Sequence, residues 1–379
     1  MYCKKKRAVI VITANTSWYI YNFRKNTIIK LLELGFNVIA VAPQDIYSPK
    51  LEKLGASFMH IDIDQGGTNP IKDLKTLFSF YKIYSHLDVD VVLNFTPKNN
   101  IYSTLAASVN GTKVINNIAG LGVVFIKNGL TSKIAKFLYK ISQSRADKIF
   151  FQNEDDRKLF LDAKLASSYV TDRLPGSGVD MNRFNVIEAP DDGKVRFLLI
   201  ARMLYDKGVG YYVEAARQLK SKYGDQVEFQ LLGFLGVNNP SSVTHDEMRC
   251  WEDEGIISYL GTSDNVEIQI GAIDCQVLPS FYREGVPKTL LEAGAMGKPI
   301  ITTDNVGCRE TVDDGINGFL CQPKSTQSLV DKLELMINMS HSERLAMGLK
   351  SRSKIESEFD ESIVIQKYIV AVSELLERC

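Results

Sequence analysis

The chain has 379 residues, 45% of them hydrophobic and 24% charged, a composition that indicates two globular domains, each burying its own core. Its 45 basic and 45 acidic side chains balance, yet residues 1–190 hold 25 lysines and arginines against 16 acidic residues, an excess of about +9. This half is expected to attract anions or an acidic membrane surface, with scattered solvated charges as the alternative; no nucleic-acid partner is expected.

The cysteines and the hydropathy of the chain indicate the cellular compartment in which the protein works. The six cysteines form no CxxC pair, which indicates a reduced, cytoplasmic chain with neither a zinc site nor a disulfide framework; they are Cys3, Cys250, Cys275, Cys308, Cys321 and Cys379. No apolar run approaches a transmembrane helix, and the apolar part of MYCKKKRAVIVI is too short for a signal peptide. Work at a membrane would therefore be peripheral, on the inner face.

The chain opens with a predicted βαβ unit, made of a strand over 8–14, a helix over 26–34 and a strand over 37–42. The connection at 15–25, NTSWYIYNFRK, is predicted as a loop and lacks the GxGxxG of a dinucleotide site. Its aromatic residues either stack on a sugar or pack, and packing is favoured for at least half of them: Trp18, Tyr19, Tyr21 and Phe23, followed by the basic Arg24.

Two further segments combine apolar and basic residues. Residues 71–87 place apolar side chains at helical spacing with lysines between, which favours an ordinary amphipathic helix over membrane contact. Residues 130–148, LTSKIAKFLYKISQSRADK, are more basic and aromatic, and here a membrane-surface helix and a packed helix are equally favoured.

Between these segments, a strand over 89–95 and a loop over 96–100 lead into a helix that ends near Val109. Lys98 beside that helix N-terminus suits a phosphate, or is a surface lysine near a cap. Residues 114–125, VINNIAGLGVVF, are predicted as a strand followed by a Gly-Leu-Gly bend at Gly120 to Gly122. Another strand follows over 149–152.

A polar stretch at 188–193 is predicted to link two domains. Strands are predicted in the second domain over 195–201, 228–232 and 274–278, whereas the polar residues 238–254 carry little signal. The most informative stretch runs from Leu278 to Leu320. It contains the end of a strand, a loop with Glu284, a helix over 288–296, a strand over 300–303 and a turn over 313–318.

This strand-loop-helix unit places its loop at the carboxyl edge of a parallel sheet, where ligands bind. Pro287 fits an early helix position, and the backbone N–H groups from Gly285 to about Leu290 are expected to cradle an anion with the helix dipole. Carboxylates at Glu284 and Glu292 would repel a bare phosphate and are better explained as acceptors for sugar hydroxyls. The combination is typical of a nucleotide-sugar site.

Glu284 and Glu292 stand in PSxxEGxPxxxLEAxAxGxPI, which resembles the signature of the retaining glycosyltransferases of family 4. The resemblance implies an α/β fold of the GT-B type, with two Rossmann-like domains facing each other across a cleft. It implies an acceptor-binding domain over 1–187, onto which a C-terminal helix at about 360–379 packs back, and a nucleotide-sugar domain over 188–359. PGSGVDMNRF at 175–184 is similar to the family's element at the end of the first domain.

Arg202 and Lys207 match the family's Arg-x4-Lys pair, which is associated with the donor diphosphate. Two fixed cations would stabilise the charge on the leaving group, so no metal and no cofactor are expected. With Glu284 they form the predicted catalytic set. The resemblance assigns binding of the UDP-sugar donor to Glu292, Gly285, Val286, Pro287, Lys288, Thr289 and Gly233.

Further matches are similar to a bacterial branch of the family, among them Tyr21-Asn22-Phe23-Arg24, Gly120-Leu121-Gly122 and Gly307-Cys308. This branch includes an N-acetylgalactosaminyltransferase that extends diphospho-undecaprenol-linked bacillosamine. By that resemblance the acceptor site comprises Arg24, Lys98, Asn117 and Gly120. The chain departs from the pattern at Ala119, where many members carry a histidine and that branch relative a glutamate.

The resemblance therefore implies transfer of a hexose or N-acetylhexosamine from a UDP-sugar to a polyprenyl-diphosphate-linked saccharide for a bacterial surface glycan. UDP-GalNAc is the first candidate donor, followed by UDP-GlcNAc or UDP-Gal. Two alternatives are an isomerase related to UDP-sugar 2-epimerases and a catalytically idle nucleotide-sugar-binding scaffold. Intact Glu284, Glu292, Arg202 and Lys207 argue against the scaffold.

Overall fold

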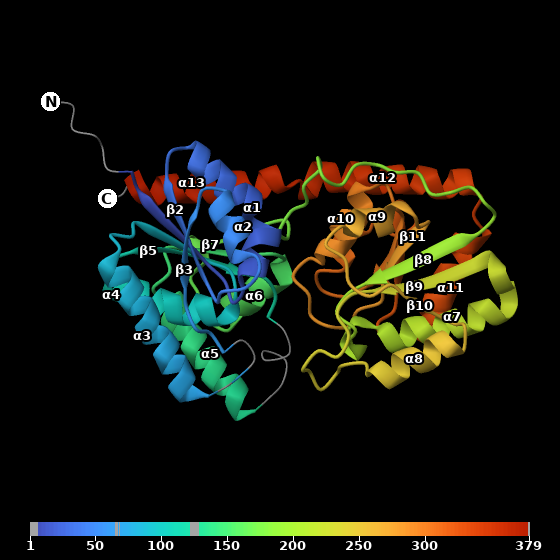
Figure 1. Ribbon diagram of the computed structural model, residues 1–379, viewed down its shortest axis with the longest axis horizontal. Helices are drawn as coiled ribbons and strands as arrows, with labels where there is room; N and C mark the ends of the chain where they lie inside the picture. The colour runs from blue at the N-terminus through green and yellow to red at the C-terminus, as the bar shows by residue number, and fades with distance from the viewer. Residues whose placement is uncertain (1–6, 65–66, 68, 122–128, 378–379) are drawn as a thin grey trace. The chain divides into compact units, whose positions relative to one another are not determined.

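The computed structural model describes residues 7–64, 67, 69–121 and 129–377 (Figure 1). Cys3, Cys379 and the part of the predicted bend over 122–125 lie outside these residues. The chain forms two compact units: unit 1 consists of residues 1–177 and 362–379, and unit 2 of residues 178–361. Each unit is an α/β layer structure in which short strands alternate with helices.

In the described part of the chain, unit 1 contains a sheet of seven parallel strands in the order β3-β2-β1-β4-β5-β6-β7. They are β1 (Val9–Thr13), β2 (Asn37–Ala42), β3 (Ser57–His60), β4 (Val91–Asn94), β5 (Lys113–Ile118), β6 (Lys148–Phe151) and β7 (Thr171–Arg173). Successive side chains of a strand point to opposite faces, so Ile10 and Ile12 enter one core and Val11 the other. Burial on both faces explains the continuous apolar runs of the central strands.

Helices cover both faces of this sheet. The core that contains Ile10 receives side chains from α1 (Ser17–Glu33), α2 (Ser48–Lys53) and α13 (Glu361–Glu377). The core that contains Val11 receives them from α3 (Pro70–His86), α4 (Thr104–Val109), α5 (Leu130–Gln143) and α6 (Glu154–Asp162). The helix predicted near the C-terminus therefore packs on the sheet of unit 1, whose strands precede it by about 190 residues or more in the sequence.

The predicted loop over 15–25 is wrong, because α1 already begins at Ser17. Thr16 Oγ1 caps the helix by accepting a hydrogen bond of 3.0 Å from the Tyr19 backbone N–H. Tyr19 and Phe23, one turn apart, stack with their ring centroids 4.7 Å apart. Packing along the first turns of α1 thus accounts for these aromatic residues.

Unit 2 has, among its described residues, six parallel strands in the order β10-β9-β8-β11-β12-β13. They are β8 (Val195–Ile200), β9 (Val227–Leu232), β10 (Ser258–Tyr259), β11 (Cys275–Leu278), β12 (Ile300–Thr303) and β13 (Gly318–Cys321). The strands predicted over 195–201, 228–232, 274–278 and 300–303 are confirmed to within one residue at each end. In each sheet the strand order changes direction next to the strand that comes first in the sequence, β1 in unit 1 and β8 in unit 2. In unit 2 this topological switch point lies between β8 and β11, so the loops after these two strands flank it.

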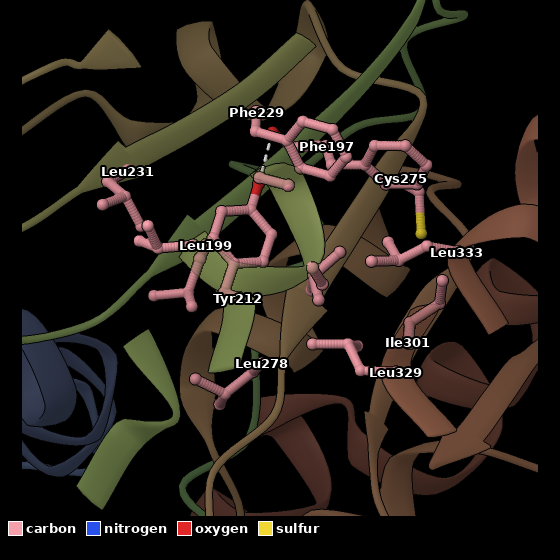
Figure 2. Close-up of a cluster of buried hydrophobic side chains, with 14 of the residues drawn as sticks. Phe197, Leu199, Tyr212, Phe229, Leu231, Cys275, Leu278, Ile301, Leu329 and Leu333 are labelled. Carbon is pink, nitrogen blue, oxygen red and sulfur yellow. Dashed lines mark hydrogen bonds between the residues drawn. The ribbon is translucent and has the colours of Figure 1, made fainter. Parts of the chain in front are cut away.

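Two cores also lie on the two faces of the unit 2 sheet. Figure 2 shows the first, where Phe197, Leu199 and Tyr212 pack together and the Tyr212 hydroxyl donates to the Phe197 carbonyl at 2.9 Å. The helices on this side are α7 (Val209–Tyr223), α8 (His245–Asp253) and α11 (Thr326–Asn338). On the other side lie α9 (Val266–Gly271), α10 (Lys288–Ala295) and α12 (His341–Phe359).

The chain passes between the units twice, and both crossings leave unit 2 at adjacent positions. Val179 N–H donates to the Phe359 carbonyl at 2.9 Å, and Glu361 N–H donates to the Val179 carbonyl at 3.1 Å. Gly178 has a φ of +72°, and a Cβ there would lie 2.5 Å from the Glu361 Cα. Only glycine fits so close an approach in that conformation.

Candidate active site

The predicted donor residues of unit 2 lie on the loops that follow β8 and β11. Lys207 ends a short 3₁₀ turn, Tyr205–Lys207, after β8. Its Nζ forms an ion pair with Glu284 Oε1, which also accepts a hydrogen bond of 2.9 Å from Ser280 Oγ. Both side chains are mostly buried, at 14% and 11% exposure. The structure therefore joins two residues of the predicted catalytic set at the switch point of the sheet.

The two loops are also joined through their backbones. The N–H groups of Phe281 and Tyr282 both donate to the Asp206 carbonyl at 3.1 Å. Gly208 has a φ of +83°, and a Cβ there would lie 2.1 Å from the Pro279 carbonyl oxygen. A larger residue at position 208 would push the two loops apart.

The end of β12 and the loop that follows it contact the backbone of the loop that carries Glu284. Asn305 Nδ2 donates to the Tyr282 carbonyl at 2.9 Å, and Thr303 Oγ1 donates to the Ser280 carbonyl. Gly307, at a φ of +78°, approaches so closely that a Cβ would lie 1.8 Å from the Gly285 carbonyl oxygen. The Glu284 loop is thus fixed before any ligand arrives, which is the preorganisation that electrostatic catalysis requires.

Helix α10 begins directly after this loop. It starts at Lys288, its N-cap is Pro287, and no side-chain hydrogen bond caps it. Gly285 and Val286, which precede the cap, are buried. A helix N-terminus without a side-chain cap favours an anion. Thr289 and Glu292 both lie in the first two turns of α10, close to this N-terminus.

Glu292 is the second carboxylate of the motif and is 8% exposed. Burial raises the pKa of Glu292, and the positive charges of Lys288 and Arg183 partly oppose this shift. Lys288 precedes Glu292 by four residues, so the two side chains share one face of α10. The buried carboxylate is suited to accept hydrogen bonds from hydroxyl groups of a ligand.

Gly233 and Arg202 complete the predicted donor set. Gly233, after β9, has a φ of +140°, and a Cβ there would lie 1.8 Å from the Ala201 carbonyl oxygen. Its own carbonyl accepts a hydrogen bond of 2.7 Å from the Tyr259 hydroxyl. Arg202 is exposed, and its charge acts on Tyr282, whose pKa is raised mainly by burial and secondly by Glu284. Arg202 therefore lies near the Lys207–Glu284 pair.

The predicted acceptor residues of unit 1 fall into two groups. Lys98 follows β4 and forms an ion pair of 2.5 Å with Asp73 of α3, with the two side chains 16% and 14% exposed. Asp73 also accepts a hydrogen bond of 2.9 Å from the Tyr102 hydroxyl. Tyr102 lies in a π-helical segment, Asn99–Ser103, inside the helix that continues as α4. Such segments are frequent at functional sites.

Arg24 and Asn117 form the second group, together with a residue that the sequence did not single out. Arg24 is 1% exposed, and its guanidinium carbon lies 4.3 Å from the Phe95 ring centroid and 5.6 Å from that of Tyr368. Asn117, at the end of β5, donates from Nδ2 to the Tyr368 hydroxyl. Gly120 follows with a φ of +118°.

Sequence reasoning missed Asp73 and Tyr368. Asp73 was one of several charges on a predicted amphipathic helix, and Tyr368 was an apolar position of the last helix. Nothing local distinguishes either of them, because Tyr368 meets Asn117 across 251 positions of the chain. Gly307, in contrast, belongs to the Gly307-Cys308 pair that the sequence resemblance had already singled out.

Neither a metal centre nor a membrane-spanning helix is found among the described residues. In residues 7–64, 67, 69–121 and 129–377, no group of three or more His, Cys, Asp or Glu side chains is placed to hold a metal ion. The same residues contain no helix with the length and hydropathy needed to cross a bilayer. Cys250, Cys275, Cys308 and Cys321 are free thiols.

Comparison with known families gives two matches that together span both units. Residues 9–153 match the profile described as glycosyl transferase 4-like, and residues 180–354 match the profile of glycosyl transferases group 1. The second match contains all of the predicted catalytic and donor-binding residues, Arg202, Lys207, Gly233, Glu284 to Thr289 and Glu292.

Curated relatives include the N,N'-diacetylbacillosaminyl-diphospho-undecaprenol α-1,3-N-acetylgalactosaminyltransferase of Campylobacter jejuni. It is 29% identical over 370 residues, which cover 92% of this chain and 94% of the relative. An Escherichia coli UDP-Gal:α-D-GlcNAc-diphosphoundecaprenol α-1,3-galactosyltransferase is 23% identical over 69% of this chain and 70% of its own.

Solved structures support the fold. A glycosyltransferase from Rickettsia africae superposes with a TM-score of 0.79 at 18% identity and covers 99% of this chain and 100% of its own. HepE from Anabaena, in complex with UDP, gives 0.77 at 16% identity over 97% of this chain and 100% of its own. The two α/β units and these neighbours confirm the predicted two-domain GT-B fold.

Proposed function

Because the chain belongs to the GT4-type glycosyltransferases, we propose that it transfers a hexose or N-acetylhexosamine from a UDP-sugar to a polyprenyl-diphosphate-linked saccharide. The observation that carries the proposal is the near full-length similarity to a transferase whose name specifies a diphospho-undecaprenol acceptor. A second relative has the same kind of acceptor and a UDP-sugar donor. UDP-GalNAc is the first donor to test, followed by UDP-GlcNAc and UDP-Gal, and the product would serve a surface glycan.

The geometry of unit 2 supports the following proposed roles in donor binding. Lys207 and Arg202 stabilise the charge that develops on the leaving diphosphate, and the N-terminus of α10 supports the same anion. Glu284, oriented by Lys207 and Ser280, accepts hydrogen bonds from donor-sugar hydroxyls. Glu292 accepts hydrogen bonds from the ribose, and the base lies at the turn of Gly233, which packs against the Ala201 carbonyl.

The proposed reaction retains the anomeric configuration. The acceptor hydroxyl attacks the anomeric carbon on the face from which UDP departs, the bond to UDP breaks, and the departing phosphate oxygen takes the hydroxyl proton. No protein nucleophile takes part. A glycosyl-enzyme adduct trapped during turnover and detected by intact-mass spectrometry would contradict this route.

We also propose that the reaction needs no divalent metal, because Lys207 and Arg202 supply the positive charge that a metal would otherwise bring. Activity should therefore persist in EDTA. Loss of activity that Mg²⁺ or Mn²⁺ restores would overturn this part of the proposal.

The deciding experiment is a UDP-release assay over a panel of UDP-sugars in EDTA, with and without a synthetic polyprenyl-diphosphate saccharide. Release that requires one UDP-sugar and the lipid-linked acceptor would establish the transferase and identify its donor. A UDP-sugar converted without acceptor would favour the isomerase. Nucleotide-sugar binding with no turnover of any pair would favour the scaffold.

Access to a lipid-linked acceptor suggests peripheral membrane contact through two helices of unit 1. Helix α3 exposes Ile71, Leu74 and Phe78 at 56–67%, and α5 exposes Leu130, Ile134 and Phe137 at 50–75%. Both helices pack against the π-helical segment Asn99–Ser103, so they belong to one side of the unit 1 sheet. Exposed lysines accompany the apolar side chains, namely Lys72, Lys75 and Lys82 on α3 and Lys133 and Lys140 on α5.

This composition fits an anionic bilayer surface, because apolar side chains enter the headgroup region while lysines bind acidic lipids. Cosedimentation with vesicles that contain an anionic phospholipid should be strong and should weaken with salt. Leu74→Ser should reduce it, whereas Leu349→Ser, at a comparably exposed position of α12, should not. Equal binding to neutral vesicles, or equal loss in both variants, would contradict the proposal.

A further inference from the structure

Tyr368 is a residue of the C-terminal helix that meets two predicted acceptor residues of unit 1. Its side chain is fully buried, and its ring packs edge-on against Phe95 and Phe150 with centroid distances of 5.6 and 5.3 Å. These contacts fix the ring, so the hydroxyl has one place in the core. Tyr368 reaches this place only because α13 packs back on the unit 1 sheet.

The Tyr368 hydroxyl determines how the Asn117 amide is oriented. Asn117 Nδ2 donates to that hydroxyl, and the amide is therefore turned so that Oδ1 points away from it. Asn117 Oδ1 is buried and has no hydrogen-bond partner among the described residues. Burial raises the pKa of Tyr368 to about 12, so the hydroxyl stays protonated across the physiological range.

A second amide oxygen nearby is in the same condition. Asn100, in the π-helical segment after β4, donates from Nδ2 to the Asn117 carbonyl at 2.8 Å. Its Oδ1 is likewise buried without a partner in the described part of the chain. Buried carbonyl oxygens without hydrogen bonds are rare in folded proteins and call for an explanation. Here two of them belong to residues that a hydrogen bond connects. Asn100 lies in the segment that follows β4 and Asn117 lies near the carboxyl end of β5, and α/β sheets bind ligands beyond the carboxyl ends of their strands.

We propose that Tyr368 is a positioning residue of the acceptor site, which holds the Asn117 amide so that Oδ1, with Asn100 Oδ1, accepts hydrogen bonds from O–H or N–H groups of the acceptor saccharide. The proposal rests on the proposed transferase function. It assigns to α13, which packs on unit 1, a role in acceptor recognition, whereas the proposed donor residues all belong to unit 2. A site that offers two fixed acceptors selects strongly for a ligand with donors at those places.

Arg24 supports the same assignment. Its guanidinium lies against the rings of Phe95 and Tyr368 and donates from Nη2 to Ser177 Oγ at 3.3 Å. The Tyr368 ring therefore contacts one predicted acceptor residue and its hydroxyl contacts another. A phenylalanine at this position keeps the ring contacts with Arg24 and removes only the contact with Asn117.

Tyr368→Phe is accordingly the central variant. Without the hydroxyl, the Asn117 amide is free to rotate, and acceptor kcat/KM should fall about tenfold, equivalent to about 1.4 kcal/mol. The loss should appear mainly in the acceptor KM, whereas the donor KM should stay within about twofold. Tyr212→Phe in unit 2 removes a comparably buried hydroxyl, which donates to the Phe197 carbonyl, and should leave the acceptor KM unchanged.

A double-mutant cycle separates positioning from general destabilisation. If Tyr368 acts through Asn117, then Tyr368→Phe should add no further loss in an Asn117→Ala background. Additive losses, or an equal fall in donor and acceptor parameters together with a lowered Tm, would overturn the proposal. So would a Tyr368→Phe enzyme with the acceptor KM of the wild type.

Calorimetry can measure the binding of farnesyl-diphosphate-linked N-acetylglucosamine to the full-length chain. This experiment distinguishes failure of the proposed transferase function from failure of the proposed role of Tyr368. A wild-type chain that neither binds this probe nor releases UDP with any lipid-linked saccharide refutes the transferase, and the role of Tyr368 with it. A wild-type chain that binds the probe no better than Tyr368→Phe does refutes the role of Tyr368 alone. Weaker binding by Tyr368→Phe, with Tyr212→Phe equal to wild type, supports it.

Discussion

At the scale of single residues, Lys207 and Glu284 form a largely buried ion pair in the proposed donor site. Both are largely buried, so removal of one partner leaves the other charge poorly solvated. The pair also places a cation next to the carboxylate that is proposed to meet the donor sugar. Loss of one partner should therefore reduce both the stability of unit 2 and the rate of catalysis.

We predict that Lys207→Ala and Arg202→Ala each reduce turnover by on the order of 10²-fold or more, since each removes a positioned charge that stabilises the leaving group. Steady-state UDP release measures this. Lys194→Ala is the matched control, because Lys194 forms an ion pair of 2.8 Å with Glu228 in the same unit but is 43% exposed. Exposed pairs contribute little, so this variant should keep near wild-type activity. Wild-type rates in both site variants would remove the diphosphate role.

We predict that the ionised Glu292 carboxylate lowers the stability of the folded chain and strengthens binding of the UDP-sugar. Burial raises its pKa in the folded chain, so ionisation opposes folding, and this cost appears as the pH rises from the unfolded pKa of a glutamate through the raised value. Glu292→Gln should thus raise Tm at pH 7 without donor and raise the KM for the UDP-sugar. The gain in Tm should vanish at acid pH below the ordinary glutamate range.

Glu334→Gln provides a control of opposite sign. Hydrogen bonding to Lys222 lowers the pKa of Glu334, so its ionised form supports folding above the ordinary glutamate pKa. This variant should lower Tm slightly at pH 7 and leave the donor KM unchanged. If Glu292→Gln instead lowered Tm at pH 7, the interpretation of Glu292 as a desolvated carboxylate would be wrong.

At the scale of elements, three loops at the carboxyl edge of the unit 2 sheet hold one another in place. Gly307 lies at the closest contact, because a Cβ there would meet the Gly285 carbonyl oxygen at 1.8 Å. We predict that Gly307→Ala displaces the Glu284 loop and reduces UDP-sugar affinity at least about tenfold, since the alanine methyl group cannot fit beside that carbonyl. Calorimetric titration with the UDP-sugar measures the change.

Gly315 is the matched position for this test. Its φ is +76°, close to the +78° of Gly307, but a Cβ at position 315 would meet no described atom within 4 Å. Both substitutions to alanine carry the same backbone strain, so their difference isolates the steric contact between the loops. Equal effects of the two variants would mean that strain alone is responsible.

The elements that carry the proposed donor site could be predicted from the sequence in detail. The strand that ends at Leu278, the helix from Lys288 and the strand over 300–303 all appear within a residue of their expected positions. Glycine and proline mark these boundaries, and their effects on the backbone are local. Helix α8 also carries a local signal, the capping box of Thr244 and Glu247, although the polar composition of 238–254 obscured it.

Other features could not be predicted, because they depend on contacts distant in sequence. The first turns of α1 are rich in aromatic residues with modest helix propensity, and packing of Tyr19 near Phe95 and of Tyr21 near Tyr47 stabilises the helix there. The ion pair of Lys98 with Asp73 and the contact of Asn117 with Tyr368 join separate elements. The residue types were visible in the sequence, but their partners were not.

At the scale of the whole molecule, each unit has its own cores. Both hydrophobic clusters of unit 2 are built from residues 179–359, and both clusters of unit 1 from residues 10–174 and 364–375. We predict that residues 178–361 expressed alone unfold cooperatively and bind UDP. Thermal unfolding with and without UDP checks this.

The fragment 178–340 is its control. It lacks α12, whose Ile355 and Phe359 are fully buried in the second core of unit 2. It should therefore fail to fold. A fragment 178–361 that is as unstable as this control would show that unit 2 depends on the rest of the chain.

The adjacent crossings at Val179 and Asp360 have a consequence for how such proteins can be recombined. Both ends of unit 2 leave the same spot on its surface, so the unit is topologically an insert in the chain of unit 1. Unit 2 could therefore be removed from the chain at these two neighbouring backbone positions. The corresponding unit of another family member could be inserted at the same two positions. Under the proposed division of roles between the two units, chimeras of this design should change the sugar that is transferred and keep the lipid-linked saccharide that receives it.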